Sequence, residues 1–169
     1  MDDKRLYLIA KLDAATQQNL TRLYTALVDA GSSENPKPSI PFHITMASFE
    51  PTQEAEVLAR TKAVCAKTSP FSLTLSNIGL FGSKVLFIAP AINQELLDLH
   101  NALDPLEPAV GVHNWVAHVT MLLDEPEPAI LSAVPIVART FSPTAAKVES
   151  IAVYEYPPAR FMGEFPLEG

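Results

Sequence analysis

Cysteine is almost missing from this chain of 169 residues, in which Cys65 stands alone. A single thiol excludes an internal disulfide framework and a cysteine-based zinc cage. Cys65 lies in a stretch with helical character, where an isolated cysteine is expected to fill the core. Charged residues are also few, 18% against 48% hydrophobic residues, and this balance argues against intrinsic disorder, which needs low hydrophobicity and high charge density.

Long apolar runs are missing too. No segment approaches the ~20 apolar residues that a membrane-spanning helix needs. The N-terminus, Met-Asp-Asp-Lys-Arg, leads directly into a short apolar run without the hydrophobic core and cleavage site of a signal peptide. We therefore expect a cytoplasmic protein that does not enter a membrane and works as a monomer.

Basic residues are outnumbered, with 12 Lys and Arg against 19 Asp and Glu and a net charge of −7. A broad basic surface that holds long nucleic acid through phosphate contacts is therefore not expected. Local basic residues can still bind one phosphate, so a small nucleotide or an RNA end remains a candidate partner. The signatures GxxxxGK and GxGxxG are absent, which removes support for the common triphosphate and dinucleotide sites.

Apolar periodicity divides the chain into two halves that share one order of elements: strand, helix, strand, helix, strand. The first half is predicted to contain strands at 6–12, 42–49 and 71–75, and helices that begin after the N-cap Asp13 and at Pro51. The second half is predicted to contain strands at 84–89, 115–123 and 147–156, a helix at 93–103, and a helix from about Pro128 that Pro135 should kink or shorten.

This repeated order predicts an α+β fold, with one domain over residues 1–169 built from two repeats, about 1–78 and 79–169. We expect two antiparallel-type sheets that flank a central groove, with the helices outside. Segment 78–83, which contains two glycines, is predicted to form the turn between the halves. A Pro-rich loop at 103–108 is expected to border the groove, where loops often select substrate.

The middle strand of each half carries the same short pattern. Residues 42–46 read Phe-His-Ile-Thr-Met and residues 117–121 read Ala-His-Val-Thr-Met, with the two histidines 75 positions apart. Because side chains alternate across a strand, His43 and Thr45 share one face, and so do His118 and Thr120. Two such matches in the same slot of an apparent repeat favour a functional pair over two histidines satisfied in the core.

Two imidazoles and two hydroxyls suit an in-line displacement at phosphorus. A neutral imidazole can take a proton from the attacking water, while a protonated one supplies a proton to the leaving oxygen. The hydroxyls of Thr45 and Thr120 can donate to non-bridging phosphate oxygens. The scheme needs no metal or other cofactor, and the pattern does not say which of His43 and His118 is the acid. A metal site is the rival use of the two histidines, but no Asp, Glu or Cys lies at ligand-like spacing beside either.

With its two His-x-Thr motifs, its repeated halves and its length, the chain resembles the 2H phosphoesterase superfamily, in particular the bacterial 2′-5′ RNA ligase-like and cyclic phosphodiesterase branch. The segment 79–86 and the ending at 153–156 and 165–167 are also similar to family features. The resemblance implies cleavage of a cyclic phosphodiester, often a 2′,3′-cyclic phosphate on RNA or a nucleotide, or action on 2′-5′ linkages. A module that binds a nucleotide or RNA end without turnover is the alternative.

Four further residues are expected to contact the substrate. The rings of Phe81 and Tyr154 can stack on a base. The side chains of Lys84 and Arg160 can contact a phosphate.

Three residues that could also suggest chemistry are assigned other roles. His100 and His113 are expected to be surface or structural histidines. Trp115 is expected to pack in the core.

Overall fold

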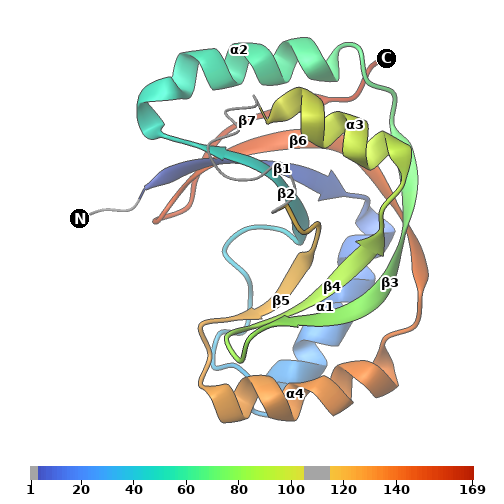
Figure 1. Cartoon of the computed structure of the whole chain (residues 1–169). Helices are drawn as coiled ribbons and strands as arrows, with labels where there is room; N and C mark the ends of the chain where they lie inside the picture. The colour runs from blue at the N-terminus through green and yellow to red at the C-terminus, as the bar shows by residue number, and fades with distance from the viewer. Residues whose placement is uncertain (1–3, 105–114) are drawn as a thin grey trace.

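Seven strands and four α-helices form the part of the chain that the computed structural model describes, residues 4–104 and 115–169 (Figure 1). In chain order the elements are β1 (Arg5–Leu12), α1 (Ala14–Asp29), β2 (His43–Phe49), the 3₁₀ helix η1 (Pro51–Gln53), α2 (Glu54–Cys65), β3 (Phe71–Phe81), β4 (Val85–Ala91), α3 (Gln94–Leu103), β5 (Val119–Leu123), α4 (Glu127–Thr140), β6 (Thr144–Tyr156) and β7 (Arg160–Pro166). No helix within these ranges is both long and apolar enough to cross a membrane. From residue 105 onward the predicted loop at 103–108 lies outside the described residues, as does His113.

All seven strands belong to one antiparallel sheet, in which the path is β2-β1-β6-β3-β4-β5 and β7 pairs with β6. The α+β class is confirmed, but the structure has one sheet where the sequence led us to expect two. The cause is that the long strands β3 and β6 pair with each other through residues 71–75 and 144–148. Beyond this stretch β6 pairs with β1 and β3 pairs with β4, so hydrogen bonding is continuous between the halves.

The pattern of strand pairs is the same for both halves of the chain. β1 pairs with β2 and β6, and its counterpart β4 pairs with β5 and β3. The helices follow the same rule, because α1 contacts α4 and α2 contacts α3. This pattern supports the two repeats at about 1–78 and 79–169, which stay a prediction.

The two ends of the sheet path meet. β2 and β5 are the outermost strands of the path, yet they contact each other. In Figure 1 the sheet curls through β6 and β3, with α2 and α3 above the β1–β2 end and α4 below the β4–β5 end. The strands that carry the two motifs are therefore edge strands of one curled sheet.

Alternation along the motif strands separates a buried face from an open one. Ile44 and Met46 on β2 and Val119 and Met121 on β5 are at most 3% exposed. The histidine and threonine of each motif, which alternate with these residues, are half-buried. The period-two pattern read from the sequence is confirmed on both strands.

The predicted N-cap of α1 acts as expected. Asp13 caps the helix by accepting from the backbone N–H of Thr16 over 3.0 Å, and it accepts from the backbone N–H of Lys147 over 2.7 Å. After the helix, Gly31 takes a φ of 77°, a left-handed value that glycine adopts without strain. The cap therefore also fixes the start of α1 against β6.

Three details of the secondary structure differ from expectation. Segment 78–83 is mostly strand, because β3 continues to Phe81 and forms a hairpin with β4. β5 begins at Val119 and not at 115. β7 was missed altogether, because Gly163 and Pro166 interrupt the alternation that identifies a strand.

Cys65 fills the core as expected. It is the last residue of α2, and its side chain is fully buried. Burial raises the pKa of the Cys65 thiol to about 11, so the thiol stays protonated at neutral pH.

α4 contains an internal proline, Pro135, which should lower the stability of the protein. The helix continues through Pro135 to Thr140, so it does not end where a shortened helix was expected. Proline has no N–H to offer the preceding turn, and Pro135 is exposed, so its ring contributes little to the core. We expect Pro135→Ala to raise the free energy of unfolding by about 1–3 kcal/mol.

Urea denaturation measures this change, with Ser132→Ala on an exposed part of the same helix as the control. A Pro135→Ala protein no more stable than the unmodified chain would contradict the prediction. That result would mean that the restriction of the unfolded chain by proline outweighs the missing hydrogen bond.

Candidate active site

The same irregularity occurs at both motifs. The β1–β2 ladder skips Met46, the residue after Thr45. The β4–β5 ladder skips Met121, the residue after Thr120. Each motif methionine is therefore the extra residue of a β-bulge, a feature that bends a strand and redirects the neighbouring side chains.

Both motif histidines are held by the same kind of hydrogen bond. The Nδ1 atom of His43 lies 2.6 Å from the carbonyl oxygen of Pro41, and that of His118 lies 2.7 Å from the carbonyl oxygen of Val116. A carbonyl only accepts, so Nδ1 carries a hydrogen in each ring and donates it. Nε2 is then the atom that titrates, with a lone pair in the neutral ring and an N–H in the imidazolium.

The two histidines are close in space although they are far apart in sequence. β2 contacts β5, and the indole Nε1 of Trp115 donates to the carbonyl of Thr45 over 2.9 Å. Burial lowers the pKa of His43, the carbonyl of Pro41 opposes this by stabilising the imidazolium, and the charge of His118 lowers the pKa further. His43 is therefore biased toward the neutral form.

Two phenylalanine rings pack beside His118. The ring of Phe81 meets the imidazole edge to face with 4.9 Å between centroids, and the ring of Phe87 lies 5.2 Å away. The two phenylalanine rings are 4.5 Å apart. Phe81, expected to contact the substrate, is 38% exposed, whereas Phe87 is 7% exposed. Phe81 therefore presents an open aromatic surface beside His118.

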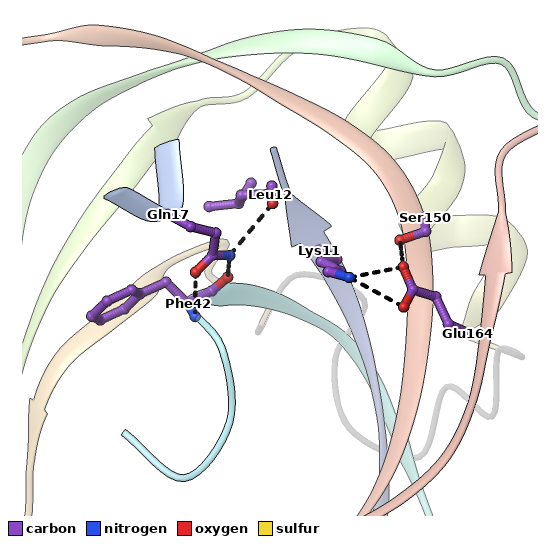
Figure 2. Close-up of polar contacts among 6 residues, drawn as sticks. All are labelled: Lys11, Leu12, Gln17, Phe42, Ser150 and Glu164. Atoms are coloured by element: carbon purple, nitrogen blue, oxygen red, sulfur yellow. Dashed lines mark hydrogen bonds and ion pairs between the residues drawn. The ribbon is translucent and has the colours of Figure 1, made fainter. Parts of the chain in front are cut away.

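His43 has polar neighbours instead. Lys11 is its cross-strand partner, so the two side chains lie on the same face of the sheet. The Nζ of Lys11 lies 3.1 and 3.2 Å from the carboxylate oxygens of Glu164, which also accepts from the hydroxyl of Ser150 over 2.7 Å (Figure 2). The hydrogen bond from Ser150 and the presence of Lys11 lower the pKa of Glu164, although burial acts in the opposite direction.

A second contact in Figure 2 fixes the start of β2. The side-chain amide of Gln17, on α1, donates to the carbonyl of Phe42 over 2.6 Å and accepts from the N–H of Phe42 over 3.1 Å. Both backbone groups of the residue before His43 are thus held by one side chain. Sequence reasoning missed Gln17 and Lys11, because helix and strand periodicity showed only that they lie outside the core.

Tyr154 lies on the same face as His43, and Lys84 lies in an exposed turn. Tyr154 is on β6, and the register places it on the face of Lys11 and His43, with its ring 5.4 Å from that of Phe161. Lys84 is exposed in the turn after β3, and its backbone N–H donates to the carbonyl of Phe81 over 3.3 Å. Their contact with a substrate stays a prediction.

Arg160 is placed differently. It pairs in register with Glu155, which lies on the face opposite to Tyr154. Its guanidinium is 3.2 Å from Glu155 and 3.5 Å from Glu54 of α2. The structure therefore puts Arg160 in ion pairs on the side of the sheet that α2 covers, away from the face of the motif side chains.

Two cavities among the described residues, with volumes of about 390 and 820 Å³, have no motif histidine in their walls. The larger is lined by Lys11, Gln17, Ser150 and Glu164 among others, so it adjoins the contacts of Figure 2. Within 4–104 and 115–169, no three His, Cys, Asp or Glu side chains gather as a metal-ligand set.

Comparison with known proteins places these observations in a family. A model of the 2′-5′ RNA ligase superfamily matches residues 12–159. No curated protein sequence gives a significant match.

Solved structures show a similar fold. The chain is similar to Escherichia coli LigT in its apo form, at 18% identity over 100% of both chains with a TM-score of 0.66. It is similar to LigT complexed with 3′-AMP at 18% identity, again over 100% of both chains, with a TM-score of 0.65. For the protein TT0787 of Thermus thermophilus the values are 18% identity, 98% of each chain and a TM-score of 0.62.

Gly79 gives a test of the aromatic surroundings of His118. It pairs with Phe87, and a β-carbon at position 79 would overlap the Phe87 ring. Gly79→Ala should therefore displace that ring and change the ring current at His118. We expect the His118 imidazole resonances in the NMR spectrum to shift, with smaller changes at His43.

Gly163→Ala is the matched control, because its added carbon would meet the ring of Phe165 at an ordinary 3.5 Å. His118 resonances that stay in place in a folded Gly79→Ala protein would show that Gly79 does not position the ring beside His118.

Proposed function

The chain belongs to the 2′-5′ RNA ligase superfamily of phosphoesterases, and from this membership we propose that it is a metal-independent phosphodiesterase. Its substrate is a cyclic phosphodiester, such as a 2′,3′-cyclic phosphate on a nucleotide or an RNA end, or a 2′-5′ linkage. Its catalytic groups are His43 and His118, with Thr45 and Thr120 as phosphate-binding partners.

The observation that carries this proposal is the equivalence of the two imidazoles. Each donates through Nδ1 to the carbonyl two residues earlier, which leaves Nε2 for proton transfer. Each is followed by a threonine on the same strand face and by a bulged methionine. One group begins β2 and the other lies directly before β5, and these two strands are in contact. Two proton-transfer groups of one geometry are what an in-line displacement needs on its two sides.

In the proposed hydrolysis, water attacks phosphorus opposite the leaving sugar oxygen. Nε2 of neutral His43 accepts the proton of the water as the new P–O bond forms. Nε2–H of protonated His118 gives its proton to the sugar oxygen as the old P–O bond breaks. His43 takes the role of base because burial and the charge of His118 lower its pKa. Proton exchange with solvent then restores both rings.

The threonines hold the group that reacts. Thr45 lies on the open face of β2 and Thr120 on that of β5, and each is half-buried. Their hydroxyls donate to the non-bridging oxygens of the phosphate, where negative charge is concentrated in the transition state. Thr→Val substitutions remove these donors and keep the branched shape that suits a strand.

A small nucleotide is the substrate class that fits best. One of the similar structures is LigT complexed with 3′-AMP, and this complex supports the choice. Phe81, open and beside His118, is suited to stack on the base. Lys84 and Tyr154 are further candidates for contact, whereas Arg160 is already ion-paired with Glu54 and Glu155.

Loss of either imidazole should remove most of the activity. We expect His43→Ala and His118→Ala each to lower kcat/KM for a 2′,3′-cyclic nucleotide by about 10²- to 10⁴-fold. The double variant should be little worse than either single one, because the two groups act in one step. Thr45→Val and Thr120→Val should cost less.

Product formation is followed by chromatography in the presence of EDTA, which should leave the activity unchanged. Turnover that EDTA abolishes and added zinc restores would contradict the metal-independent scheme.

The pH dependence distinguishes the two histidines. Protonation of His43 removes the base, and because its pKa is lowered the neutral form persists to lower pH. The acid limb of kcat/KM should therefore lie below the ordinary histidine value of about 6.5. Deprotonation of His118 removes the acid and produces the alkaline limb, so the profile is a bell. A rate that rises steadily with hydroxide far above neutral pH would show that no histidine acts as the acid.

A further inference from the structure

The bulge on β2 exposes two neighbouring carbonyls to donors from the other half of the chain. In a regular strand, successive carbonyls point to opposite edges, so only one of two would be free on an edge strand. At the bulge, the carbonyl of Thr45 accepts from Nε1 of Trp115 over 2.9 Å. The carbonyl of Met46, the bulged residue, accepts from Nδ1 of His100 over 2.7 Å.

The two donors are themselves packed as one unit. The rings of His100 and Trp115 are stacked, with 3.8 Å between centroids and 4° between planes. His100 comes from α3, and its side chain is only 13% exposed. The stack fixes both rings at once, so neither donor can turn away from β2 without separating from the other.

This unit lies only a few residues in sequence from each motif histidine. Trp115 is three residues before His118, and its acceptor, Thr45, is two residues after His43. The strand path ends at β2 and at β5, and no ladder pairs these two strands in the described part of the chain. The side-chain donors therefore take the place of the backbone ladder that joins other neighbouring strands.

We propose that His100 and Trp115 form a clamp that positions β2 against the segment before β5 and so sets the separation of the two motif histidines. They are positioning residues, because they act on His43 and Thr45 through the backbone of β2. The effect of the clamp on turnover rests on the proposed function, but its effect on the distance between His43 and His118 does not.

Core packing of the two rings is the competing explanation. Packing and the clamp require different properties of the side chains. Packing at Trp115 needs only a large ring, which phenylalanine supplies. The clamp needs the indole N–H. At position 100 it needs a donor at the place of Nδ1, which asparagine offers through its amide and alanine does not.

Four variants separate these demands. Trp115→Phe keeps a ring and removes the donor, and His100→Ala removes both ring and donor. His100→Asn restores the donor without the ring. Asn101→Ala, at the next and exposed position of α3, is the matched control. Urea denaturation first identifies the variants that remain folded under the assay conditions.

The decisive readout is the NMR titration of His43, which needs no substrate. In the unmodified protein, burial and the charge of His118 hold the pKa of His43 down, while Lys11, the cation beside it on β1, is paired with Glu164. Loosening the clamp weakens the burial of His43 and the influence of the His118 charge. The pKa of His43 should therefore rise in folded Trp115→Phe and His100→Ala. It should return toward the original value in His100→Asn and stay unchanged in Asn101→Ala.

Turnover gives the second readout. Because misplacing a catalytic group by about 1 Å can cost about 10²-fold, kcat should fall by about 10- to 100-fold in Trp115→Phe with a smaller change in KM. A folded Trp115→Phe protein with an unchanged His43 titration would overturn the clamp. If the unmodified protein turns over no phosphodiester while the titration shifts as expected, the proposed function fails and the clamp stands.

Discussion

The meeting of two sheet edges is the constraint on which the rest of this structure depends. Outermost strands of an antiparallel sheet normally lie far apart, and β2 and β5 meet because the sheet curls where β3 pairs with β6. Edge strands leave backbone groups without ladder partners, a liability that proteins usually cover. Here Trp115 and His100 donate to two carbonyls of β2, those of Thr45 and Met46, and so join β2 to the segment that precedes β5.

Much of the local structure could be predicted from the sequence, because its causes are local. The alternation around His43 and His118 and the cap at Asp13 depend on residues a few positions apart. The single sheet could not be predicted, because the pairing of 71–75 with 144–148 is a long-range choice that neither segment encodes alone. In the candidate site the motif residues could be named because their pattern occurs twice. Lys11, Gln17 and the role of His100 belong to no pattern and depend on which strand or helix lies beside them.

The strand pairs and helix contacts of the two halves match, but the surroundings of the two histidines differ. Phe81 and Phe87 pack beside His118, whereas Lys11, paired with Glu164, accompanies His43. The two histidines thus occupy equivalent backbone positions but have chemically different neighbours, aromatic beside His118 and charged beside His43. An asymmetric substrate, with an aromatic base at one end and polar sugar groups at the other, matches such a site better than a symmetric one.

Charge around the histidines limits what can hold a phosphate in the proposed reaction. The ammonium of Lys11 is balanced by the carboxylate of Glu164, and the guanidinium of Arg160 by two glutamates. In a chain with a net charge of −7, a phosphate between the motifs in the proposed reaction therefore depends for its electrostatic stabilisation on a protonated imidazole and on Lys84, the exposed candidate contact. In the proposed reaction, the same imidazolium that stabilises the bound phosphate is also the group that delivers a proton to the leaving oxygen.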